Sequence, residues 1–238
     1  MTKNTQVFLA QRPVGEPSDE SFGFREVDIP ELADNQVLIR VCWLSLDPYM
    51  RGRMNDVKSY ADPLQIGDVI TGESSGVVIK STSVDFGVGD TVAAHMGWQS
   101  HLVANADDPR LMKVDLDNGS LSAHLGVVGM PGRTAYFGLT EVGKPQPGET
   151  LVVAAASGAV GSAVGQIAKI KGLRAVGIAG GPEKCRYVKE ELKFDACIDY
   201  KTDNFAAELA AACPDGVDIY FENVGGDVTK AVSLLLNP

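Results

Sequence analysis

Basic residues are scarce in this chain, and their scarcity limits what it can bind. Its 238 residues include 21 Lys and Arg against 31 Asp and Glu, a formal net charge of −10. No cluster of Lys or Arg stands out. Because nucleic acids and anionic membranes are bound by basic surfaces, we expect neither as a partner.

Cysteine and histidine are also few. The cysteines, Cys42, Cys185, Cys197 and Cys213, form no C-x-x-C pair, which argues against a zinc ribbon or a redox dithiol. The three histidines have no cysteine at ligand spacing, so we predict no metal site. The G-x-S-x-G and H-E-x-x-H motifs are missing as well, so neither a nucleophile elbow nor a zinc-protease helix is predicted.

Long hydrophobic runs are missing too. The longest apolar stretch, Leu151 to Ala168, is broken by polar residues and glycines, so it predicts no membrane span. The N-terminal residues lack the apolar core of a signal peptide. Hydrophobic residues still make up 45% of the chain, enough for a buried core. We therefore expect a cytoplasmic protein with reduced thiols.

The most informative stretch runs from Thr150 to Gly172. It predicts a strand, a turn of small residues and a helix, which is the opening of a dinucleotide-binding βαβ unit. Gly158 would let the backbone approach a pyrophosphate, and Gly161 would let the helix pack close to the strand. The first glycine of G-x-G-x-x-G is replaced by Ala156, so the fingerprint is a variant one.

Two regions differ in their pattern along the chain. From Thr5 to about Val114, frequent short strands separated by turns predict a compact, barrel-like β domain. From Thr150 onward strands and helices alternate, which predicts a parallel, doubly wound α/β sheet. Helices over Ser120 to Val128 and Thr134 to Val142 are predicted between the two regions.

The fourth predicted strand of the second region, Val217 to Phe221, is followed by a helix over Gly226 to Leu236 and then by the last residues. A six-stranded dinucleotide fold would need on the order of 60 more residues. The fourth strand would be left as an exposed apolar edge. We expect either that the chain is a fragment of a longer protein or that something else covers this edge.

The second strand of this region bears on the choice of cofactor. An NAD site usually has a carboxylate at this strand end, but Ile178 is followed by Ala179, Gly180 and Gly181, although Glu183 is close behind. Lys184 comes soon afterwards and suits a ribose 2′-phosphate, which favours NADPH over NADH. Spacing alone leaves open that Lys184 is an ordinary solvated helix lysine.

Four stretches of the chain together form a recognisable pattern: Leu44–Arg51, Gly129–Gly132 with Thr134–Tyr136, Ala155–Gly165 and Phe221–Gly226. In these stretches the chain resembles the zinc-independent branch of the medium-chain dehydrogenase/reductase superfamily. This branch contains curcumin reductase, prostaglandin reductase and plant alkenal double-bond reductases, and the bacterial curcumin reductase type looks most similar. Zinc members of the superfamily have a histidine where this chain has Gly72.

The resemblance implies a GroES-like β-barrel domain over residues 1–125 and an incomplete doubly wound (Rossmann) domain over residues 126–238. It also implies a cofactor site for NADPH. The residues of that site would be Gly158, Ala159, Val160 and Gly161 at the pyrophosphate, Lys184 and Tyr200 at the 2′-phosphate, Asn223 facing the cofactor, and Met130 and Thr134 along the nicotinamide.

Tyr49 would sit near the substrate carbonyl if the resemblance holds, as the catalytic residue. The alternative for Tyr49 is a half-buried tyrosine whose hydroxyl bonds to the backbone. Arg133 departs from the family pattern, because relatives commonly carry an apolar residue there.

The function implied is NADPH-dependent reduction of the C=C bond of α,β-unsaturated ketones or aldehydes. Two alternatives remain open at this point. One is quinone reduction by the same superfamily, and the other is a non-catalytic, NADPH-binding relic or scaffold. The family also implies a homodimer.

Overall fold

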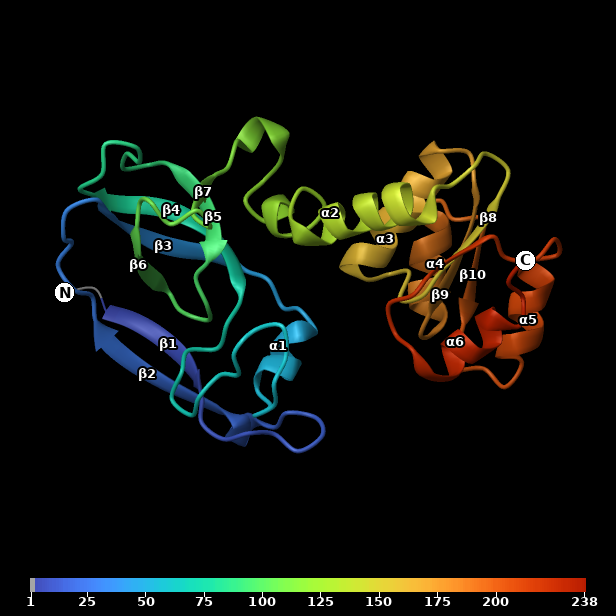
Figure 1. Cartoon of the computed structure of the whole chain (residues 1–238), viewed down its shortest axis with the longest axis horizontal. Coiled ribbons are helices and arrows are strands. Elements are labelled where there is room, and N and C mark those ends of the chain that lie inside the picture. The colour runs from blue at the N-terminus through green and yellow to red at the C-terminus, as the bar shows by residue number, and fades with distance from the viewer. Residues whose placement is uncertain (1–2) are drawn as a thin grey trace. The chain divides into compact units, whose positions relative to one another are not determined.

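A computed structural model describes residues 3–238 of the chain, coloured from the N-terminus to the C-terminus in Figure 1. The chain divides into two units, the first ending at Leu125 and the second running from Gly126 to Pro238. Across residues 3–238, no helix is both long enough and apolar enough to cross a bilayer.

The first unit is built from antiparallel strands, which confirms the predicted GroES-like β domain. A hairpin joins β1 (Lys3–Leu9) to β2 (Phe22–Asp28). A five-stranded sheet has the order β6-β3-β4-β5-β7. Its strands are β3 (Gln36–Leu44), β4 (Glu73–Ser81), β5 (Thr91–His95), β6 (His101–Asn105) and β7 (Met112–Lys113).

One short helix, α1 (Tyr49–Arg53), interrupts the first unit and was not predicted from the sequence. Its Met50 is buried. Just beyond the helix, Met54 belongs to a small core with Leu9, Leu64 and Ile70. This packing places Tyr49 at the N-terminal end of a helix rather than in an open loop.

The second unit holds a four-stranded parallel sheet, as predicted, with the order β10-β9-β8-β11. The strands are β8 (Thr150–Val153), β9 (Arg174–Ala179), β10 (Ala196–Asp199) and β11 (Ile219–Phe221). The helices are α2 (Met130–Phe137), α3 (Ala159–Ile170), α4 (Pro182–Glu190), α5 (Phe205–Ala212) and α6 (Gly226–Ser233). The chain leaves β8 toward β9 and later returns on its other side, so the strand order reverses between β8 and β11.

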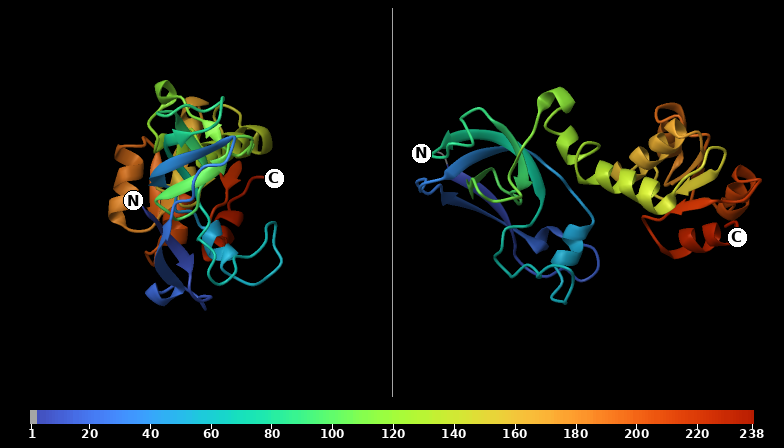
Figure 2. Two further views of the ribbon diagram at one scale, coloured as in Figure 1. Left: turned by 90° about the vertical axis from the view of Figure 1, so that its left-hand side faces the viewer. Right: turned by 45° about the horizontal axis from the view of Figure 1, so that its top comes forward.

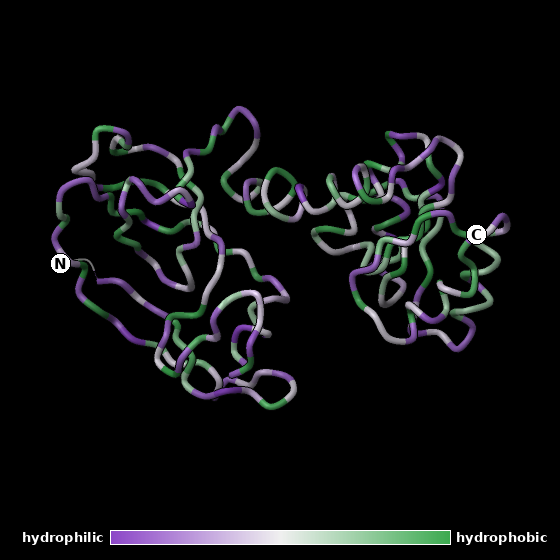
Figure 3. Tube along the Cα trace, viewed as in Figure 1, coloured by the Kyte–Doolittle hydropathy of each residue, from purple (hydrophilic) through white to green (hydrophobic). Residues whose placement is uncertain are grey.

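Both faces of this sheet are covered by helices (Figure 2). Leu151 and Val153 point to one face, where they pack with residues of α2, α3 and α4. Val152 and Ala154 point to the other face, toward α5 and α6. Alternation of side chains along a strand explains this division, and burial on both faces explains why β8 is apolar from Leu151 to Val153 (Figure 3).

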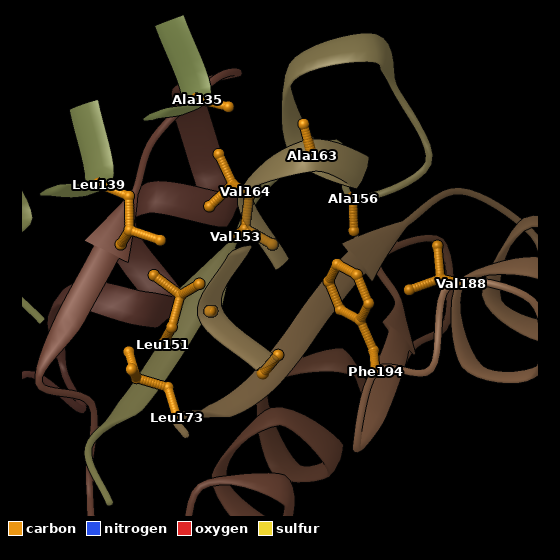
Figure 4. Packing of buried hydrophobic residues seen from close by; sticks show 12 residues of the cluster. Ala135, Leu139, Leu151, Val153, Ala156, Ala163, Val164, Leu173, Val188 and Phe194 are labelled. Carbon is orange, nitrogen blue, oxygen red and sulfur yellow. The ribbon is translucent and has the colours of Figure 1, made fainter. Parts of the chain in front are cut away.

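A glycine makes room for the ring of Phe194 in the core between the sheet and helices α2, α3 and α4. A Cβ on Gly165 of α3 would lie 1.7 Å from the ring of Phe194. Phe194 is 5% exposed and fills the space beside Ala156 and Val188, as Figure 4 shows. The predicted close packing of α3 therefore depends on Gly165 as well as on the glycines of the turn.

The two helices predicted between the β region and the α/β region, over Ser120 to Val128 and Thr134 to Val142, were partly wrong. Only a 3-10 turn, Ala123–Leu125, lies within the first predicted stretch. The second helix starts earlier, at Met130, and continues as a π-helical turn over Gly138–Gly143. Gly129 ends the first stretch, and Pro131 suits the first turn of a new helix, because it has no N–H that needs a partner there.

The expectation that the fourth strand is left as an exposed edge holds only in part. Val217 forms a parallel bridge with Leu236. Its N–H donates to the carbonyl of Leu235 at 2.8 Å, and its own carbonyl accepts from the N–H of Asn237 at 2.9 Å. The residues before β11 are therefore paired, while β11 itself lies at an edge of the sheet formed by residues 3–238. This pairing also explains why α6 ends at Ser233 rather than at Leu236.

Candidate functional site

The turn between β8 and α3 has the properties that a bound phosphate needs. Gly158 is exposed and is the N-cap of α3, which has no side-chain capping hydrogen bond. The free N–H groups and the positive end of the helix dipole there attract an anion. A Cβ on Gly161 would lie 2.3 Å from the carbonyl oxygen of Ala155, so only glycine allows this approach of helix to turn.

The backbone conformation that usually requires glycine falls on Ala155. This residue has φ +50°, in the left-handed region, and its side chain is exposed. Ala156, at the place of the missing first glycine, is fully buried in the core. In this variant fingerprint, the turn therefore contains one alanine, Ala155, in a strained left-handed conformation.

The other residues predicted at the pyrophosphate have different surroundings. Ala159 is exposed at the start of α3. Val160 is partly buried and packs against the core. Val160 could therefore contact a phosphate only through its backbone.

A cavity of about 640 Å³ joins the glycine turn to α4. Its lining residues are Ser157, Gly158, Glu183, Lys184, Arg186, Tyr187, Glu190 and Glu191. The structure thus brings Gly158 and Lys184, two predicted site residues, to one cavity. Arg186 adds a second cation, which lies 3.9 Å from a carboxylate oxygen of Glu190.

Tyr200 lies against the end of β9. A Cβ on Gly180 would meet its ring at 2.9 Å, and the Tyr200 N–H donates to Ala179. Its neighbour Asp199 accepts the backbone N–H groups of Gly181 at 2.9 Å and Lys201 at 3.0 Å, which lower the pKa of Asp199. The Asp199 carboxylate, which lies near the end of β9, is therefore already bonded to the backbone of the adjacent loops.

Open α/β sheets bind ligands in the crevice beside a reversal of strand order, at the carboxyl ends of the strands. Here the order reverses between β8 and β11. Asn223 follows β11 at this point. Its side-chain Nδ2 donates to the carbonyl of Ala154 at 3.0 Å, just beyond β8. Asn223 is thus held beside the start of the glycine turn.

Met130 and Thr134 occupy neighbouring positions on α2, and the Thr134 hydroxyl lies 3.5 Å from the Met130 sulfur. Thr134 and Arg133 are both exposed. A place for Met130 and Thr134 along a nicotinamide stays a prediction.

Tyr49 has a buried hydroxyl that meets no hydrogen-bond partner in the part of the chain that the structure describes. The alternative of a hydroxyl bonded to the backbone is therefore wrong. Burial raises the pKa of Tyr49, the carboxylates of Asp47 and Glu73 raise it further, and the Thr71 side chain lowers it in part. The hydroxyl therefore stays protonated near neutral pH and keeps its capacity to donate a hydrogen bond.

Gly72, at the position of the zinc-ligand histidine, is closely surrounded. A Cβ there would lie 2.9 Å from Met50, 3.0 Å from Leu44 and 3.3 Å from Trp98. Among residues 3–238, no three side chains of His, Cys, Asp or Glu are grouped as metal ligands would be.

Several residues of the cavity were missed from the sequence. Tyr187 lies one turn beyond Lys184 on α4, so the helical spacing could have identified it. Ser157 directly precedes Gly158 and could have been found with it. Arg186 had no such signal.

Both units of the chain match known protein families. Residues 5–114 match a family described as the N-terminal domain of oxidoreductase, and residues 159–238 match one described as zinc-binding dehydrogenase. The NADPH-dependent curcumin reductase of Escherichia coli is 51% identical over 235 residues, which are 99% of this chain and 68% of that protein. Prostaglandin reductase 1 of Mus musculus is 44% identical over 222 residues, 92% of this chain and 65% of that protein.

A solved structure agrees closely with both units. The crystal structure of CurA from Vibrio vulnificus in complex with NADPH has a TM-score of 0.92 and 51% identity. The alignment covers 98% of this chain and 68% of that one. The Escherichia coli relative is described as NADPH-dependent, and the Vibrio vulnificus relative was crystallised with NADPH.

Proposed function

Since the chain belongs to the medium-chain dehydrogenase/reductase family, in the group of curcumin reductase and prostaglandin reductase 1, we propose that it serves NADPH-dependent reduction of C=C bonds in α,β-unsaturated ketones or aldehydes. The main support for NADPH as the cofactor is the cavity that Gly158 and Lys184 share. The proposed class of substrate is supported by the names of the relatives. A homodimer in the cytoplasm is part of the same proposal.

The residues at the glycine turn and at the start of α4 suit a dinucleotide that carries a 2′-phosphate. The uncapped start of α3 suits the diphosphate, and Lys184 with Tyr200 would hold the 2′-phosphate. Asn223 would fix the cofactor near the crevice between β8 and β11. When bound, NADPH supplies the hydride for the β-carbon of the substrate.

Tyr49 is proposed to donate a hydrogen bond to the substrate carbonyl oxygen. Negative charge gathers on that oxygen as the C=C bond is reduced, so a donor placed there stabilises the enolate. The raised pKa of Tyr49 keeps its proton in place for this task. The α-carbon would take its proton from water or from a tyrosine.

The test follows NADPH absorbance with an enone, with its saturated ketone and with a quinone, using the protein as its host makes it. We expect oxidation of NADPH with the enone and none with the saturated ketone. Tyr49→Phe should lower kcat on the order of a hundredfold, the usual effect of removing one oxyanion donor, and should leave NADPH affinity unchanged.

Other outcomes identify the alternatives. Turnover of quinones alone would mean a quinone reductase. NADPH binding with no turnover of either substrate would mean a scaffold, and failure to bind NADPH would remove the proposal altogether.

A further inference from the structure

Glu222, directly after β11, collects four hydrogen-bond donors. Its Oε1 accepts the backbone N–H of Val224 at 2.5 Å and that of Gly225 at 2.8 Å. Its Oε2 accepts the hydroxyls of Tyr220 and Thr229. One carboxylate therefore ties together the end of β11, the turn that follows and helix α6.

The backbone of this turn is intrinsically flexible. Gly225 and Gly226 both have left-handed backbone, with φ +85° and +67°. Gly225 is also the N-cap of α6 and brings no capping side chain. Two glycines in sequence carry a large conformational entropy in a free chain, so the fixed shape of this turn depends on Glu222.

Asn223 lies inside the same turn, directly after Glu222. Its Nδ2 bond to the Ala154 carbonyl is the one that holds it beside the start of the glycine turn. A shift of the turn would therefore displace Asn223 from the crevice between β8 and β11.

We propose that Glu222 is a positioning residue of the dinucleotide site, which keeps Asn223 and the turn over residues 222–226 in the geometry that binds the cofactor. Glu222 acts through its neighbours and not by contact with the cofactor. This inference rests on the proposed function, because it assumes that the crevice binds NADPH.

The ionisation of Glu222 suits this role. Burial by itself would raise its pKa, but the hydrogen bonds from Thr229, Tyr220 and the two backbone N–H groups lower the pKa to about 2. The carboxylate thus keeps its charge, and its four donors, across the neutral range.

The experiment measures NADPH affinity through the fluorescence of NADPH in the parent protein and in four variants. Glu222→Ala should raise the NADPH Kd about tenfold, the loss expected when a charge-assisted hydrogen bond that orders the site is removed. Glu222→Gln should recover most of the affinity, because its amide oxygen still accepts the N–H groups of Val224 and Gly225.

Asp218→Ala is the matched control. Asp218 lies before β11, at the opposite end of the strand from Glu222, and its carboxylate accepts the N–H of Thr150 at 2.8 Å and the Asn237 amide at 2.7 Å. Its loss should lower the melting temperature without changing the Kd for NADPH. If Glu222→Ala fails to fold, Thr229→Val removes a single donor and should raise the Kd by a smaller factor.

The outcomes separate this inference from the proposed function. No NADPH binding by the parent protein would overturn the proposed function itself. NADPH binding that is unchanged in Glu222→Ala and in Thr229→Val would overturn the role of Glu222 alone. Equal rises in Kd for Glu222→Ala and Asp218→Ala would also overturn it, because the effect would then follow stability.

Discussion

Lys184 is the side chain whose charge should decide between NADPH and NADH. It is exposed on the first turn of α4 and shares a cavity with Gly158. Removing a lysine that bonds a phosphate costs about 1.5–3 kcal/mol, so Lys184→Ala should raise the Kd for NADPH roughly ten- to a hundredfold. The Kd for NADH should stay the same, since NADH has no 2′-phosphate.

Lys189 provides the control for this change. It is another exposed lysine, in the last turn of the same helix. Lys189→Ala should leave both affinities unaltered. Equal loss of NADPH and NADH binding in Lys184→Ala would show that Lys184 does not recognise the 2′-phosphate, and the sequence-based alternative of an ordinary helix lysine would then hold.

At the scale of single elements, α1 is too short to be stable alone and depends on Arg51. The Arg51 guanidinium donates to the carbonyls of Pro13 at 3.0 Å and Gly15 at 2.9 Å, and to the side chain of Asn55 at 2.6 Å. Arg51→Met should lower the free energy of unfolding by about 1–3 kcal/mol. Arg51→Met should also lower kcat, because Tyr49 is the first residue of the same helix.

Arg53→Met is the comparison, measured like Arg51→Met by urea unfolding. Arg53 lies in the same helix but makes one such side-chain bond, to the Asp62 carbonyl at 2.9 Å. The loss of stability should be smaller and kcat should stay closer to that of the parent. Equal effects of the two substitutions would contradict a special role for Arg51 in placing Tyr49.

The same helix illustrates which elements a sequence can predict. The parallel strands and α3 are visible as apolar patterns, because each buries a regular face. Helix α1 has five residues, too few to show a period, and long-range arginine bonds hold it. The predicted extension of α6 to Leu236 failed for a similar reason, since Val217, far away in the sequence, pairs with those last residues.

At the scale of the whole chain, the change from short strands to alternating strands and helices was enough to predict both kinds of sheet. The glycine turn was predicted because its small residues are local. Glu222 and Arg186 were not singled out, although their partners lie within seven residues of them. No residue pattern shows that the turn after β11 folds back on the Glu222 carboxylate, or that Arg186 lines a cavity with the glycine turn. Patterns of small or apolar residues were thus readable from the sequence, whereas the way a turn or a cavity closes was not.

The two units should differ in their response to mild acid. In the first unit, burial lowers the pKa of His101, and Arg40 lowers it further. A lowered histidine pKa adds stability above its unfolded value of about 6.5, and that stability is lost as the pH falls through this value. In the second unit, the lowered pKa of Glu222, about 2, costs stability only when the pH falls below about 4.5.

Urea unfolding at about pH 7.5 and about pH 5.5 tests this difference. Trp43 and Trp98 are the only tryptophans and both lie in the first unit, so their fluorescence follows that unit. Its urea midpoint should fall at the lower pH, and His101→Gln should remove most of the fall while His124→Gln keeps it. The helical circular dichroism arises mainly from α2 to α6, and its midpoint should change less. A fall that persists in His101→Gln would assign the acid sensitivity to other groups of the first unit.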